Sequence, residues 1–131
     1  MDLTGCWYDP AIDGSGLIID DAPEARVVYW YGYADGFPML RDSGQMWLVG
    51  STADADRKQI TLYRPKGQWM GATYELGDAV ATIELEVESG LLLVNYRFIN
   101  LGPCKPVMVS PVWGGCGGTL KLQRLTRLAS A

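Results

Sequence analysis

The sequence predicts an all-β fold, a single antiparallel meander that closes into a barrel of about eight or nine strands. Apolar and polar residues alternate with period two over most of the chain, as they do in strands with one buried face. Turn-forming residues recur at short intervals, and no segment has a convincing helical period. The length of 131 residues suits one domain, so residues 1–131 are assigned to one barrel.

The expected strands follow one another with short turns between them. We expect about nine strands, at residues 4–8, 16–20, 26–33, 45–50, 59–63, 69–74, 79–88, 91–100 and 119–125. Asp35-Gly36 supplies the positive φ angles of a tight hairpin turn, and Ser89-Gly90 is a two-residue reversal between strands 79–88 and 91–100.

Two segments show how the strands face the core. In strand 79–88, one face holds Ala81, Ile83, Leu85 and Val87, and the other holds Thr82, Glu84, Glu86 and Glu88. This strand therefore has one dry and one wet face. In strand 26–33, one face holds Val27, Tyr29, Tyr31 and Tyr33, and the other holds Val28, Trp30 and Gly32. Neither face is polar, so one is expected to meet the core and the other a second layer, a partner or a ligand.

The opening and the end of the chain resemble a group of uncharacterised exported bacterial β-domains. The residues that carry the resemblance are Gly5-Cys6-Trp7-Tyr8-Asp9-Pro10, Gly14-Ser15-Gly16, Val28-Tyr29-Trp30, Asp35-Gly36, Trp47-Leu48-Val49-Gly50 and Gly118-Thr119-Leu120 with Arg124-Leu125-Thr126. The group has no assigned activity. The resemblance implies a periplasmic or secreted protein if a signal peptide has been removed, and the chain is otherwise expected in the cytoplasm.

The first hairpin also resembles that of the avidin–streptavidin family and, more loosely, the Gly-x-Trp of the lipocalins, which implies a calycin-like barrel. The likeness places Ser15 and either Tyr29 or Tyr31 at ligand-binding positions, with Asp9 in place of the usual asparagine. The last strand, residues 119–124, lacks the aspartate which that family uses on biotin. The resemblance therefore supports the barrel and not biotin as the ligand.

Composition excludes several classes of function. The chain has no histidine, which removes Ser-His and Cys-His nucleophile pairs and His-ligated zinc. Its net charge of −4 argues against nucleic-acid binding, and no apolar run approaches the ~18 residues of a membrane span. We expect no metal and no cofactor. Because no motif places a nucleophile beside a base, the sequence favours a non-enzymatic protein but does not exclude an enzyme.

Three cysteines leave the redox state open. A disulfide between Cys104 and Cys116 would close a short loop and leave Cys6 reduced; the alternative is three reduced thiols.

Aromatic residues supply the candidate site. The chain has 5 Trp and 7 Tyr against 2 Phe, a bias toward rings whose polar atoms find partners. We predict a concave ligand site formed by Tyr29, Tyr31, Trp47 and Trp69, with Asp9 and Ser15 beside it and Trp7 as the plug that closes one end of the barrel. Core packing and an aromatic interface are the alternatives for the same rings.

These residues lead to a ranked set of functions. The first is a non-enzymatic barrel that binds a small molecule of unspecified identity. The second is a protein–protein interaction module, with self-association into a homo-oligomer as one form of it, and the third is a carbohydrate-binding module. A deep enclosed cavity would favour the first, and a flat exposed aromatic patch would favour the second.

Overall fold

The structure is a computed structural model that describes residues 2–11, 15–33, 45–54, 56–67, 74–100 and 117–125. Eight antiparallel strands close into a barrel in the order β1-β10-β9-β8-β5-β4-β3-β2. They are β1 (Gly5–Tyr8), β2 (Gly16–Asp21), β3 (Arg26–Tyr33), β4 (Gln45–Thr52), β5 (Gln59–Tyr63), β8 (Ala79–Glu88), β9 (Leu91–Phe98) and β10 (Gly117–Arg124). A short hairpin of β6 (Lys66–Gly67) and β7 (Tyr74–Glu75) forms a separate sheet.

The predicted fold class is confirmed. Strands β3, β5 and β8 have the predicted bounds, and the other five barrel strands differ from the prediction by one or two residues, at both ends in β10 and at one end in the rest. The predicted strand 69–74 lies, apart from Tyr74, outside the described residues, as does the predicted turn at Asp35-Gly36. The Ser89-Gly90 turn is present, with φ angles of 54° and 81° that join β8 directly to β9.

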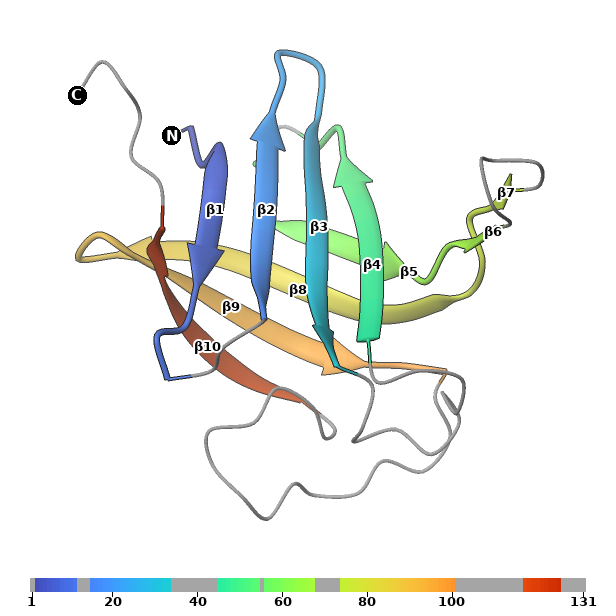
Figure 1. Ribbon diagram of the computed structural model, residues 1–131. Coiled ribbons are helices and arrows are strands. Elements are labelled where there is room, and N and C mark those ends of the chain that lie inside the picture. The colour runs from blue at the N-terminus through green and yellow to red at the C-terminus, as the bar shows by residue number, and fades with distance from the viewer. Residues whose placement is uncertain are drawn as a thin grey trace.

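The barrel is flattened into two layers whose strands cross. Figure 1 shows β1 to β4 side by side, with β5, β8, β9 and β10 crossing behind them. The corner between β4 and β5 depends on Gly50, because a Cβ there would collide with the carbonyl oxygen of Thr61 and lie 2.9 Å from Ile60 Cγ2. A glycine allows the two backbones to approach closely where the sheet bends.

The inward-facing side chains form one continuous apolar core. Its most deeply buried members are Trp7, Trp30, Leu17, Ile19, Leu48, Ile60, Leu62, Ile83, Leu92, Leu122, Val28 and Val94. Every barrel strand contributes to this set, in the alternation that the sequence predicts. Burial of this apolar area is the main favourable contribution to the stability of the barrel.

One end of the barrel is closed by the N-terminal segment. Trp7, the predicted plug, is buried at this end, and its indole N–H donates a hydrogen bond of 2.8 Å to the carbonyl oxygen of Leu3. The guanidinium of Arg124 lies 4.5 Å from the centre of the Trp7 ring, a cation–π contact. Arg124 also donates to the carbonyl oxygens of Thr4 and Asp2, so the last strand holds the first residues in place.

Candidate functional site

The structure places three of the predicted site residues on the outer surface of the barrel. Tyr29, Tyr31 and Trp47 point outward, whereas Trp30 and Gly32, which alternate with the tyrosines on β3, point into the core. The concave ligand site predicted from these residues stays a prediction, and the three side chains lie on the outside of the barrel whose one end Trp7 is predicted to close. The reason is the phase of the alternation: Val28 and Leu48 carry the buried face, so their direct neighbours point to the other side.

These rings belong to a larger uncharged surface, which we call the aromatic face. It consists of the outward-pointing residues Ile18, Val27, Tyr29, Tyr31, Trp47, Val49 and Tyr63. Cross-strand pairs connect them in a row over four strands, from Ile18 to Tyr29, Val49 and then Tyr63. Such directly opposed side chains lie close enough to pack against each other. Sequence reasoning found the aromatic strand but not this row, because the register between strands is not visible in the sequence.

Tyr31 and Trp47 form the most ordered part of the aromatic face. They are direct cross-strand partners, and their ring centres lie 5.8 Å apart with planes tilted by 36°. The Tyr31 ring lies over Gly16 on β2, where a Cβ would be 2.5 Å from the phenol oxygen. Burial, and secondarily the nearby Cys6 thiol, raises the pKa of Tyr31 above its usual value. The phenol therefore stays neutral at physiological pH.

The aromatic face is both exposed and uneven. Trp47 retains 54% and Tyr29 retains 41% of their accessible area. Beside them lies an open groove of about 340 Å³, lined by Val27, Val49, Gly50, Ser51, Tyr63 and Leu76. Exposed apolar rings grouped in this way mark binding surfaces more often than scattered single residues do.

Ser15, another predicted site residue, lies in a different place, directly before β2 and at the opposite end of that strand from Asp21. Its side chain is only 3% exposed, and the part of the chain that the structure describes offers its hydroxyl no hydrogen bond. A Cβ on Gly32 would be 3.4 Å from Ser15 Oγ and 3.2 Å from Trp30 Nε1, so these groups gather at one point of the interior.

Three inward aromatic rings lie near this end, and the sequence analysis did not select them as a site. Trp30, Tyr96 and Phe98 pack with ring centres 5.5 to 5.6 Å apart. Tyr96 and Phe98 occupy the inner positions of β9, in alternation with the exposed Asn95 and Arg97. A rule that ranked inward rings above outward ones would have found them.

The remaining predicted residues divide into a local turn and positions without a described structure. Asp9 accepts a hydrogen bond of 2.9 Å from the backbone N–H of Ala11, which is the local turn bond typical of aspartate. Trp69, Cys104 and Cys116 lie outside the described residues.

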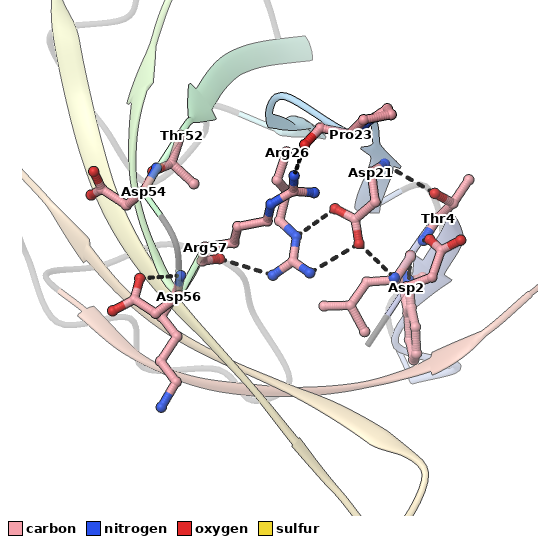
Figure 2. A network of polar contacts seen from close by, with 12 residues as sticks. Asp2, Thr4, Asp21, Pro23, Arg26, Thr52, Asp54, Asp56 and Arg57 are labelled. Carbon is pink, nitrogen blue, oxygen red and sulfur yellow. Dashed lines mark hydrogen bonds and ion pairs between the residues drawn. The ribbon is translucent and has the colours of Figure 1, made fainter.

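A polar network occupies the closed end of the barrel (Figure 2). Arg26 donates to both carboxylate oxygens of Asp21, at 2.6 and 2.9 Å, and to the carbonyl oxygen of Arg57. Burial opposes ionisation of Asp21, but hydrogen bonds from Arg26 and from the N–H of Leu3 outweigh it and lower its pKa. Hydrogen bonds that the side chain and the backbone N–H of Thr4 donate to the Asp2 carboxylate likewise lower the pKa of Asp2. The network holds the loops at this end of the barrel together. In its ion pair, the charges of Arg26 and Asp21 neutralise each other.

Within the described segments, no group of three or more cysteine, aspartate or glutamate side chains is placed to hold a metal ion. The same segments contain no helix long and apolar enough to cross a membrane.

The described residues thus define a closed antiparallel barrel with an exposed aromatic face. Comparisons of the chain with protein-family models, with curated proteins and with solved structures found no match.

Proposed function

We propose that this protein is a non-enzymatic protein–protein interaction module that binds through its aromatic face. The observation that carries the proposal is the position of Tyr29 and Trp47, two large aromatic side chains that stay about half exposed on a continuous uncharged sheet surface. Burying such rings against another protein would remove apolar area from water, and Trp and Tyr are the residues most often found at the energetic centres of interfaces.

The chemistry of the aromatic face favours a protein over a sugar as the partner. Cross-strand neighbours of the exposed Tyr29 are Ile18 and Val49, and the groove is lined mainly by apolar groups. A sugar needs hydrogen-bonding side chains around the rings that stack on it, whereas apolar residues around the rings are typical of the core of a protein interface.

A photo-crosslinking experiment in cells that produce the protein tests the proposal. Trp47 is replaced by p-benzoylphenylalanine, and crosslinked products are identified by mass spectrometry. A matched variant carries the same group at Val87, an apolar residue that is 38% exposed on β8, in the other layer of the barrel. We expect specific protein adducts from position 47 and none from position 87. Equal or absent adducts at the two positions would refute the proposal.

Small-molecule binding near Ser15, at the start of β2, is the second candidate. The observation behind it is that the described residues offer the buried Ser15 hydroxyl no hydrogen bond; an unpaired buried hydroxyl costs about 1–3 kcal/mol, and a bound polar ligand would remove that cost. Native mass spectrometry of protein purified from its own host, followed by denaturation, tests this candidate. A small molecule that is released from the wild type and is lost in Ser15→Ala would support it; a bare protein mass would count against it.

A further inference from the structure

The partner that the aromatic face fits best is a second copy of this chain. We infer that two copies pack face to face about a twofold axis near Val49, with Trp47 of each copy seated in the groove beside Tyr63 and Leu76 of the other. This inference rests on the proposed function and specifies its partner.

Shape is the first argument. A twofold interface must be self-complementary, so a projection on the surface needs a matching hollow on the same surface. The outward positions of β4 run from Trp47 through Val49 to Ser51. Trp47 is the projection, at 54% exposure, and Val49 and Ser51 line the groove of about 340 Å³. Rotation about an axis near Val49 places each indole over the groove of the other copy.

Charge is the second argument. The chain carries a net charge of −4, so two copies repel unless their contact surface excludes the carboxylates. The outward described residues of β1 to β5 include one charged side chain, Asp20, which lies toward the closed end. The carboxylates of Glu84, Glu86 and Glu88 point outward from β8, in the other layer of the barrel. Face-to-face packing of the aromatic faces therefore keeps this acidic row in solvent.

The topology is the third argument. The barrel is closed, so none of its eight strands presents a free edge to a neighbouring sheet. Association of two barrels must then use side chains on an outer face, and the aromatic face is the apolar one among the described surfaces.

Sedimentation velocity over about 1–100 μM protein, a range that covers ordinary dimer affinities, provides the first test. We expect a reversible dimer whose Kd rises about 30-fold or more in Trp47→Ala, the effect of losing an interfacial hot spot. Val87→Ala, on β8 in the other layer, should leave the Kd unchanged. A wild-type chain that remains monomeric, or a dimer that Trp47→Ala does not weaken, overturns the inference.

A charge-complementation experiment tests the position of the axis. Near a twofold axis Val49 faces its own counterpart, so Val49→Glu and Val49→Lys should each be monomeric through like-charge repulsion. Mixed in equal amounts, the two variants should recover a dimer, which also shows that both are folded. No recovery, with circular dichroism showing both variants folded, refutes this arrangement. The proposed function then depends separately on crosslinking: adducts with a different protein at position 47 would leave it standing, and no adducts would end both.

Discussion

The two layers of the barrel have the same inner surface and opposite outer surfaces. Strands β2 to β4 of one layer carry the aromatic face, which reaches Tyr63 on β5 across the corner between the layers. Strands β8 to β10 carry what we call the charged face, whose outward polar residues are Thr82, Glu84, Glu86, Glu88, Asn95, Arg97, Thr119, Lys121 and Gln123; the half-buried Leu91 and Leu93 are outward on β9 beside them. Inside, both layers contribute Leu, Ile and Val at near-zero exposure. The core therefore requires only the inward-facing residues of each strand to be apolar. The outward-facing residues can be polar, as on the charged face, so fold stability alone does not explain rings that stay exposed on the aromatic face.

The largest expected effect comes from the Asp21–Arg26 ion pair, which joins the end of β2 to the start of β3 and to the first residues of the chain. Replacing Asp21 with Asn removes the carboxylate that binds Arg26 and the N–H of Leu3, and leaves a buried guanidinium without its counter-charge. We expect a loss of about 3 kcal/mol in the free energy of unfolding at pH 7. Urea unfolding of the wild type and the variant measures it. A loss below about 0.5 kcal/mol, the range of ordinary surface changes, would contradict this role.

The same pair predicts a pH dependence. Because the pKa of Asp21 is lowered in the folded state, its stabilisation is fully present above the unfolded value near 4 and is lost as the pH falls through the folded value. The difference between the wild type and Asp21→Asn should therefore be constant from about pH 7 to pH 5 and shrink below about pH 4. Urea titrations at each pH measure this difference, and a gap that is unchanged in strong acid would contradict the assignment.

A smaller effect is expected from a change within the aromatic face. In Gly16→Ala, the new Cβ would meet the backbone oxygen of Trp7 and the phenol oxygen of Tyr31, both at 2.5 Å. We expect a loss of about 1–3 kcal/mol from overpacking. Lys121→Ala on the charged face should change stability by less than about 0.5 kcal/mol. Thermal unfolding compares the two, and equal effects would mean that Tyr31 does not need the space above Gly16.

Titration of Tyr31 distinguishes the packed part of the aromatic face from its exposed part. Its raised pKa means that the stabilisation is complete below the unfolded value of about 10 and is lost as the pH rises through the higher folded value. Absorbance at 295 nm should show a phenol that ionises above the usual range, and Tyr31→Phe should remove it. If that component persists in the variant, another tyrosine is responsible.

The smallest effect on stability is expected from the charged face. Glu84→Gln, Glu86→Gln and Glu88→Gln together take the net charge from −4 to −1. These side chains are exposed, so the free energy of unfolding should change by only a few tenths of a kcal/mol in either direction. Solubility should fall, since a net charge near zero promotes association. Precipitation by ammonium sulfate measures the solubility of the two proteins. Unchanged solubility would show that the three carboxylates of the charged face do not prevent association.

Sequence reasoning was strongest where a pattern is local. The strands, the Ser89-Gly90 turn and the wet face of β8 follow from period-two alternation and from turn residues, and the structure confirms them. The site was harder to predict, because β3 is apolar on both faces and alternation cannot show which face points inward. Gly32 on β3 and Gly50 on β4 lie on the inner side, where the backbones approach other groups. The positions of these glycines could therefore have identified the inward face of each strand. The contact between Trp7 and Arg124 depends on barrel closure, which no local pattern contains.

Closure through the first and last strands has a consequence for the time course of folding. Strand β1 pairs with β10, and the hydrogen bond from Arg124 to Thr4 spans 120 positions of the chain. During synthesis, β1 to β9 emerge from the ribosome before the strand that completes the ring. Contacts between distant parts of a chain form slowly, and unpaired strands are prone to aggregate while they wait. We therefore expect the nascent protein to depend on chaperones until β10 is released, and a chain truncated before Gly117 to be insoluble although most of its core residues are present.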